Sequence, residues 1–292
     1  MAQPTSPPGP TGGPGKGQTG AAAPAGPSPA SFKRVQVAGG GAPLVTGREL
    51  RVWLPPGYTD RANATRAYPV LYLMDGQNIF EQAPGTPAEW RADETAAELI
   101  ASGTVEPFII VGVPHSERWR MAEYCPLSGV QGVPACGEAF VDWMLAEVKP
   151  RVERAFRVKP GPEGSAIGGA SMGGLISLYA ATRHPDVFGS VLIESPSMVL
   201  GQRDTVKELL TDAKGWPARV YIGISDREVT QGENAADVNT KLVEAVRAVD
   251  AAAGTAAVQH LLVVEPGATH DEMAWARRLG PALRFLYSPE KK

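Results

Sequence analysis

Cysteine, histidine and long apolar runs are all scarce in this chain of 292 residues. It has two cysteines and four histidines, and no apolar run approaches the roughly 20 residues that a membrane-spanning helix needs. Because no histidine lies near the cysteines, the sequence gives no metal site. Acidic and basic side chains nearly balance at a net charge of −3, so no basic surface for nucleic acid or anionic lipid is expected.

The N-terminal segment 1–30 contains no aromatic residue and almost no large aliphatic one. Such a composition cannot bury enough apolar surface to offset the entropy lost on ordering. We therefore expect residues 1–30 to be a disordered Pro/Gly/Ala-rich tail and residues 31–292 to form one domain, which is long enough to bury its own core. The tail lacks the regions of a signal peptide but resembles what remains after one is cleaved. Export to the periplasm or beyond and a cytoplasmic location both stay open.

Cys125 and Cys136 flank a stretch with proline and glycine that is too irregular for a helix. Two thiols that close a short loop fit a disulfide, which would add about 2–3 kcal/mol by restricting the unfolded chain. Two reduced thiols in a cytoplasmic protein are the alternative. We favour the disulfide, which would agree with export.

Short apolar runs alternate along the chain with longer amphipathic segments. The runs predict strands at 33–37, 49–54, 70–74, 108–113, 165–168, 190–194, 219–224 and 258–264. The amphipathic segments predict helices at 90–101, 137–155 with a kink at Pro150, 172–183, 205–211, 235–251 and 271–287. The later runs are apolar on both faces, as buried parallel strands are, while the first two alternate as an antiparallel edge hairpin does. This order predicts an α/β protein with a mostly parallel, doubly wound sheet of about eight strands and helices on both faces.

The fifth predicted strand leads into Gly169-Ala170-Ser171-Met172-Gly173 and then into a helix. This G-x-S-x-G spacing between strand and helix is the nucleophile elbow of the α/β-hydrolase fold. The turn is so tight that the serine adopts a positive φ, and glycines two residues away on either side avoid collisions. Ser171 then stands at the positive end of the helix, where an oxyanion is favoured. We predict Ser171 as the nucleophile; a packed turn with an incidental serine is the alternative.

His270 is the predicted general base. In this fold the nucleophile, acid and histidine follow in that order, and the histidine lies on the loop after the last strand. His270 stands there, just before the final predicted helix. Of the other histidines, His260 begins the last strand and His184 suits a helix cap. His115 could line the pocket, but it precedes the serine.

Two carboxylates, Asp226 and Glu228, follow the seventh predicted strand, where the acid of the triad should lie. Either could accept the imidazole Nδ1–H and stabilise the imidazolium. Spacing does not choose between them, and the unused one would form a surface ion pair or cap the next helix. Glu194, after the sixth strand, is a third candidate.

Two backbone N–H groups are expected to form an oxyanion hole. One belongs to Met172, the residue after the nucleophile, and the other to the loop after the third strand. Gly76 permits a sharp turn in that loop. The N–H of Gln77 is therefore the predicted second donor.

From about residue 44 to residue 287 the chain resembles the Putative esterase family of the α/β-hydrolase superfamily. This group includes enterochelin-esterase-like hydrolases, feruloyl and acetyl-xylan esterases, esterase D and the mycolyltransferases. The motifs that carry the resemblance are, in order, PVLYLMDGQNIF, R-x-x-E-Y at 120–124, GEAFVDWMLAEVKPRVERAFRV, AIGGASMGGLISLYAA, HPDVFG, ESPS and ATHDEMAWARRL.

The resemblance implies Ser171 as nucleophile, His270 as base and the Gln77 and Met172 N–H groups as oxyanion donors. It also favours Glu228 over Asp226, because relatives read G-x-x-E after this strand. This chain departs from that pattern, with Ser225 in place of the glycine.

We therefore expect a serine carboxylic-ester hydrolase that acts on a small-molecule ester through an acyl-enzyme and needs no cofactor. An acyltransferase that uses the same site and a catalytically silent binding protein on this fold are the alternatives. A monomer and a homodimer both fit. Candidates for lining the substrate pocket are Trp119, Arg120, Tyr124 and Trp275. Core packing is the alternative for the aromatic residues, and an ion pair with Glu123 is the alternative for Arg120.

Overall fold

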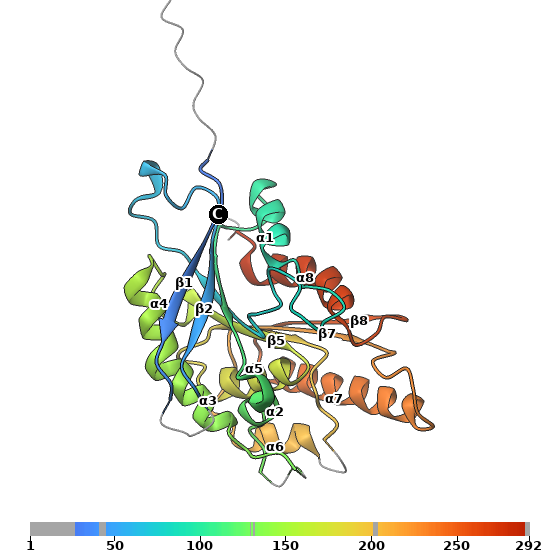
Figure 1. Ribbon diagram of the computed structural model, residues 1–292. Coiled ribbons are helices and arrows are strands. Elements are labelled where there is room, and N and C mark those ends of the chain that lie inside the picture. Colours follow the sequence, from blue (N-terminus) through green and yellow to red (C-terminus); the bar gives the residue numbers. More distant parts are fainter. Residues whose placement is uncertain (1–26, 41–44, 129, 131, 201–203, 290–292) are drawn as a thin grey trace, which may run out of the picture.

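The computed structural model describes residues 27–40, 45–128, 130, 132–200 and 204–289, which form one sheet with helices on both of its faces (Figure 1). The strands are β1 Ser31–Val37, β2 Arg48–Leu54, β3 Val70–Met74, β4 Ile109–Val113, β5 Ser165–Ala170, β6 Ser190–Glu194, β7 Arg219–Ser225 and β8 Gln259–Glu265. The helices are α1 Ala92–Ala101, α2 Arg120–Glu123, α3 Gly137–Trp143, α4 Lys149–Ala155, α5 Met172–Arg183, α6 Thr205–Thr211, α7 Ala235–Thr255 and α8 Glu272–Tyr287.

The sheet has eight strands in the order β1-β2-β4-β3-β5-β6-β7-β8. β1 pairs antiparallel with β2, and β2 pairs antiparallel with β4. Every later pairing in the order is parallel. The predicted α/β fold, with a mostly parallel sheet and an antiparallel hairpin at one edge, is confirmed.

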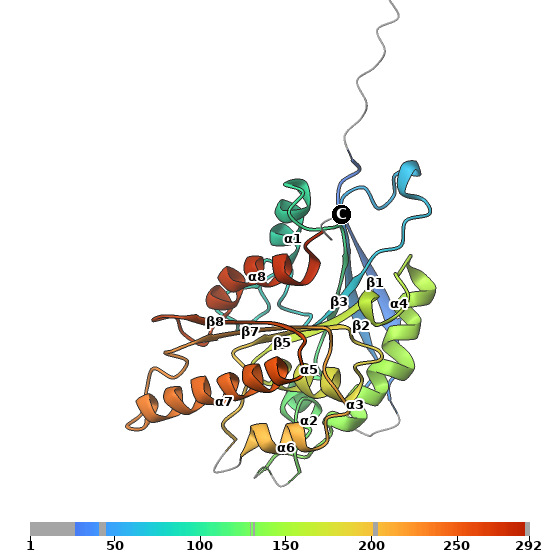
Figure 2. The same ribbon diagram turned by 180° about the vertical axis from the view of Figure 1, so that it is seen from behind.

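Alternate residues of β3 serve two separate cores. Val70, Tyr72 and Met74 pack on the face that also holds buried residues of α3, α4, α5 and α7. Leu71 and Leu73 point to the other face, among buried residues of α1 and α8. Figures 1 and 2 show α1 and α8 on one side of the sheet and α5 and α7 on the other. A strand that is apolar at every position is therefore required, because both of its faces are covered.

The helix predicted over 137–155 is divided rather than simply kinked. α3 passes into a π-helical segment, Met144–Val148, and then into α4, with Pro150 in the first turn of α4. Proline has no N–H to donate to the preceding turn. The wider π turn therefore lies just before Pro150, where this donor is missing, and irregular turns are common near a proline in a helix.

The last residues of the predicted N-terminal tail lie within the described part of the chain. Residues 1–26 of the expected tail lie outside the described part of the chain. The Ser28 N–H donates to Asp60 Oδ1 at 3.1 Å, and the Ser28 carbonyl accepts the Gly57 N–H at 2.8 Å. Backbone groups of Ser28, before the predicted boundary at residue 31, are thus bonded to the loop after β2.

β8 was predicted to be buried on both faces, and this is wrong. It is the last strand of the sheet, so only β7 pairs with it, and its first three residues, Gln259, His260 and Leu261, are exposed. The apolar run HLLVV therefore marks an edge strand that helices cover incompletely. Among the helices of the described residues, none combines the length and apolarity that a bilayer span requires.

The disulfide expected between Cys125 and Cys136 is wrong, because both side chains are thiols in the structure. The Cys125 thiol is buried and donates to the Leu127 carbonyl at 3.4 Å. Backbone hydrogen bonds bring the ends of this loop together: the Gly137 N–H donates to the Cys125 carbonyl at 2.9 Å, and the Cys136 N–H donates to the Ala122 carbonyl at 3.1 Å. The loop closes without a covalent bridge.

Candidate active site

The turn between β5 and α5 holds Ser171 in a strained backbone conformation. Its φ is 58° and its ψ is −128°, which a residue with a side chain rarely adopts. A Cβ atom on Gly169 would lie 2.7 Å from the carbonyl carbon of Gly173, so the turn closes only with glycine there. Because Met172 is the first residue of α5, its N–H has no acceptor within the helix and remains available at the positive end of the helix.

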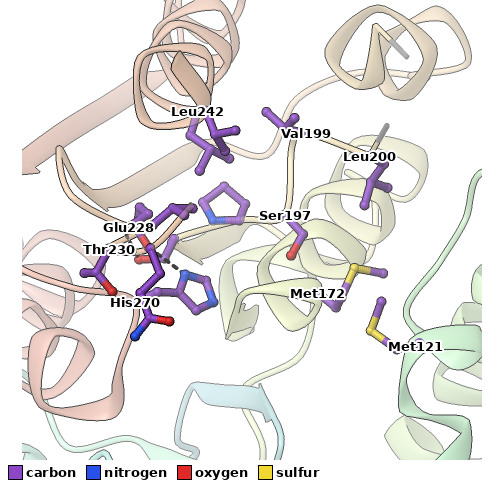
Figure 3. A pocket seen from close by; sticks show the side chains of 14 residues that line it. Met121, Met172, Ser197, Val199, Leu200, Glu228, Thr230, Leu242 and His270 are labelled. Atoms are coloured by element: carbon purple, nitrogen blue, oxygen red, sulfur yellow. Dashed lines mark hydrogen bonds and ion pairs between the residues drawn. The ribbon is translucent and has the colours of Figure 1, made fainter. Parts of the chain in front are cut away.

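Ser171 and His270 reach the same end of the sheet from different strands. The Ser171 hydroxyl lies 3.3 Å from that of Ser197, which follows β6. His270 follows β8 and lines a pocket together with Ser197 (Figure 3). No hydrogen bond joins Ser171 to His270 within the described ranges; such bonds commonly tighten only when substrate binds.

Glu228 is the carboxylate that the structure brings to His270. Its Oε2 lies 2.6 Å from His270 Nδ1, and its side chain is 2 % exposed. Its Oε1 accepts the Ser225 N–H and the Ser195 hydroxyl, each at 2.7 Å. Burial alone would raise the pKa of Glu228, but the hydrogen bonds from His270 and Ser225 outweigh it and lower this pKa below its usual value. An ionised Glu228 favours the imidazole tautomer of His270 that carries its proton on Nδ1.

Asp226, the alternative acid, is used elsewhere. Its Oδ1 accepts the N–H of Gly267 at 2.7 Å. Gly267 lies three residues before His270 in the loop after β8. Asp226 therefore ties this loop to the end of β7, and neither the surface ion pair nor the helix cap expected for the unused carboxylate describes it.

A buried hydroxyl, Ser195, supports Glu228 from behind. Ser195 has a positive φ of 40°. While its hydroxyl donates to Glu228, it accepts from Trp275 Nε1 at 3.1 Å and from Arg278 Nη2 at 3.0 Å. The ring of Trp275 also packs edge-on against the imidazole of His270, with 5.3 Å between the ring centres. Trp275 thus braces both members of the Glu228–His270 pair.

Arg278 extends this network into the core. Its Nε lies 2.8 Å from Glu194 Oε2 and its Nη1 lies 2.7 Å from Glu265 Oε2. The side chains of Arg278 and Glu194 are 3 % and 0 % exposed. Complete burial raises the pKa of Glu194 to about 7, against the opposing attraction of Arg278. Arg278 was not among the residues predicted from the sequence, where its only signal is its place in the ATHDEMAWARRL motif.

The loop after β3 contains Gln77, whose N–H is the second predicted oxyanion donor. Its first residue, Asp75, has a φ of 58°. The Gly76 N–H donates to the Val113 carbonyl at 3.0 Å, and a Cβ atom on Gly76 would lie 2.3 Å from the carbonyl carbon of Gly112. Within the described part of the chain no protein group accepts a hydrogen bond from the Gln77 N–H, so this N–H is available to a ligand.

Two of the predicted pocket residues, Arg120 and Tyr124, instead hold this loop. Arg120 Nε and Nη2 donate to the two carboxylate oxygens of Asp75 at 2.7 and 2.9 Å. The fully buried Tyr124 accepts the Asp75 N–H on its hydroxyl at 3.2 Å. The alternative pairing of Arg120 with Glu123 is wrong, since Glu123 pairs with Arg48 at 2.5 Å.

The pocket beside His270 has a volume of about 500 Å³ (Figure 3). Apolar side chains make up much of its wall: Met121, Met172, Val199, Leu200, Val229, Val238 and Leu242. No lysine or arginine is among the described residues that line it. None of the four predicted pocket residues, Trp119, Arg120, Tyr124 and Trp275, lines this pocket. Within the described ranges, no three His, Cys, Asp or Glu side chains are grouped as a metal site requires.

Comparison with known families shows to which family the chain belongs. Residues 44–286 match the sequence model of the family described as "Putative esterase". The chain belongs to this esterase family. The family and its relatives named as esterases support a carboxylic ester hydrolase.

Two relatives illustrate the range of the family. The esterase is 27% identical over 237 residues to an endo-1,4-beta-xylanase/feruloyl esterase of Xylanibacter ruminicola. This match covers 81% of this chain and 29% of that protein. It is 28% identical over 258 residues to the iron(III) enterobactin esterase of Dickeya dadantii, with 81% of this chain and 51% of that protein covered. The esterase therefore spans well under two thirds of either relative.

A solved structure shares the fold. The IroE-like serine hydrolase of Shewanella oneidensis superposes on the esterase with a TM-score of 0.65 at 21% sequence identity. The match covers 88% of this chain and 80% of that one.

Replacing Arg278 by methionine should strongly destabilise the esterase. The variant Arg278→Met leaves Glu194 buried without its cation, and breaking such a pair typically costs about 3–5 kcal/mol. Urea unfolding would measure the loss. The neighbour Arg277 is the matched control, since its 51 % exposed side chain pairs with Glu265 near the surface and Arg277→Met should cost less than about 1 kcal/mol. Equal losses for the two variants would contradict this interpretation of the buried network.

Proposed function

We propose that the esterase is a serine hydrolase with Ser171 as nucleophile, His270 as general base and Glu228 as the acid that orients it. The observation that carries the proposal is the 2.6 Å contact between His270 Nδ1 and the buried Glu228. It occurs at the same end of the sheet as a serine held in a strained strand-to-helix turn. Nucleophile, acid and base follow strands β5, β7 and β8, which is the chain order of α/β-hydrolases.

In the proposed reaction, the Ser171 hydroxyl oxygen attacks the ester carbonyl carbon while His270 Nε2 takes the hydroxyl proton. The carbonyl oxygen becomes an oxyanion, which the N–H groups of Met172 and Gln77 stabilise. When the intermediate collapses, His270 gives the proton to the departing alcohol and an acyl-enzyme remains. Water then attacks the acyl-enzyme by the same route, so that the acid is released and Ser171 regains its proton.

We further propose that the pocket beside His270 accepts an apolar acyl group. Its wall includes Met172, which supplies one oxyanion donor, and Ser197, whose hydroxyl lies 3.3 Å from that of Ser171. An acyl group bonded to Ser171 therefore lies next to this wall. Apolar side chains such as Leu200 and Leu242 favour an uncharged group, because transfer of apolar surface out of water drives its binding.

Labelling with a fluorophosphonate should attach one probe to Ser171. The probe needs an activated serine and an oxyanion hole but no knowledge of the natural ester. Intact-mass measurement should find one adduct on the parent protein, none on Ser171→Ala and slow labelling of His270→Ala. Ser197→Ala is the matched control, since its hydroxyl is the nearest other candidate, and it should label as the parent does. A folded parent that takes no adduct would contradict the proposal and favour a binding protein on this fold.

Glu228→Gln should lower kcat far more than Asp226→Asn. The amide cannot stabilise the imidazolium and can hold the wrong tautomer, a change that costs up to about 10⁴-fold in kcat in serine proteases. Asp226→Asn retains an oxygen that can accept the Gly267 N–H, so a modest effect is expected. Steady-state hydrolysis of p-nitrophenyl acetate by both variants provides the comparison. The reverse order of effects would assign the acid to Asp226.

Filling the pocket should select against long acyl groups. Leu242→Trp should lower kcat/KM for p-nitrophenyl hexanoate at least about tenfold relative to p-nitrophenyl acetate, since a few methylenes in a fitted pocket discriminate on this scale. Leu261→Trp, on the exposed part of β8, serves as the control and should leave kcat/KM unchanged for both substrates. Equal losses on both esters with Leu242→Trp would show that the acyl group lies elsewhere.

A further inference from the structure

The backbone of the loop that carries the Gln77 N–H is strained at its first residue. Asp75 has a φ of 58°, although it is not a glycine. Such a conformation costs of the order of 1–3 kcal/mol and persists only where surrounding contacts enforce it. Gly76 then packs against the end of β4 so closely that no side chain fits. The direction of the next N–H, that of Gln77, therefore depends on what holds Asp75.

Two residues of one short segment hold Asp75. Arg120 contacts both carboxylate oxygens, at 2.7 and 2.9 Å, in the two-point geometry that a guanidinium allows. Tyr124 accepts the Asp75 N–H on its hydroxyl, and the Arg120 guanidinium lies 5.4 Å from the centre of the Tyr124 ring. The side chains of Arg120 and Asp75 are 26 % and 16 % exposed, so the pair is largely shielded from water.

The same carboxylate also touches the other half of the site. A Cβ atom on Gly173 would lie 3.1 Å from Asp75 Oδ2, so the Asp75 side chain packs against the turn that carries Ser171 and Met172. His115 Nε2 approaches Asp75 Oδ1 at 4.0 Å. Burial lowers the pKa of His115 in spite of the nearby carboxylate, so Arg120 is the cation that pairs with Asp75 at neutral pH.

From these contacts we infer that Arg120 is a positioning residue for the oxyanion hole. By clamping both oxygens of Asp75, it fixes the strained loop and with it the direction in which the Gln77 N–H points. Arg120 does not line the pocket beside His270, so it acts through Asp75. The inference rests on the proposed function, because it assigns Gln77 a role in that reaction.

The test is a comparison of two arginine-to-lysine variants. Arg120→Lys keeps the charge but cannot make the planar two-point contact. It should lower kcat for p-nitrophenyl acetate and leave KM nearly unchanged. Arg120→Ala should lower kcat on the order of 10²-fold, the effect of a misplacement of about 1 Å. Arg48→Lys is the matched control. Arg48 also pairs with a buried carboxylate, that of Glu123, which lies on the same short helix as Arg120. The kcat of Arg48→Lys should equal that of the parent.

A second readout separates positioning from general stability. An arylboronic acid forms a tetrahedral adduct on an active serine and places an oxygen in the oxyanion hole. Its inhibition constant should rise in the two Arg120 variants by about the factor by which kcat falls, as expected for lost stabilisation of the transition state. Circular dichroism would identify variants that fail to fold, and Arg120→Lys then carries the test if Arg120→Ala is unfolded.

The possible outcomes are distinct. If a rise in KM accounts for the whole loss of kcat/KM in the Arg120 variants, Arg120 is a substrate contact and the inference is overturned. Equal losses in Arg120→Lys and Arg48→Lys, or unchanged boronate affinity, would reduce Arg120 to a structural residue and overturn it too. In both cases the parent enzyme still hydrolyses the ester and labels at Ser171, so the proposed function stands. A parent without hydrolysis or labelling would overturn both.

Discussion

The tight turn at Ser171 is the constraint on which the rest of the site depends. A positive φ at this residue lifts the hydroxyl above the end of the sheet and starts α5 immediately afterwards. Gly169 is required because a Cβ atom there would lie 2.7 Å from the carbonyl carbon of Gly173, and a Cβ atom on Gly173 would lie 3.1 Å from the Asp75 carboxylate. Two further non-glycine residues with positive φ, Asp75 and Ser195, directly follow β3 and β6. β3 and β6 are the neighbours of β5 in the sheet, so three adjacent strands end in strained residues, as expected where function outweighs local stability.

Two of these strained residues, Ser195 and Asp75, have their own buried support. Ser195 is held through Trp275 and Arg278, and Asp75 is held through Arg120 and Tyr124. In both places an arginine satisfies oxygens that would otherwise lie buried and unpaired, which would cost more than the ion pair gains. The main effect of these contacts is therefore on geometry. They fix the direction of the Glu228 carboxylate and of the Gln77 N–H and add little net stability.

The sequence was informative where a feature is local. Strands β3 and β6 were predicted with their observed ends, because short apolar runs bounded by turn residues leave little choice. Ser171 and His270 could be proposed because a turn spacing and a chain order identify them. What failed depends on contacts between distant segments. Periodicity does not encode the three-dimensional arrangement. This arrangement decides the partners of Arg120 and Arg278, the incomplete cover over β8 and the absence of a bridge between Cys125 and Cys136.

The short helix α2 joins two parts of the site that sequence motifs treat separately. Arg120 grips the loop after β3, while its chain neighbour Met121 forms part of the pocket wall. A single turn of backbone thus carries both side chains. A ligand that displaces Met121 would therefore also displace the anchor of Asp75, the residue that holds the loop of the proposed oxyanion donor Gln77. If Gln77 has its proposed role, substrates that differ in the group placed against Met121 would differ in kcat even where they bind equally well.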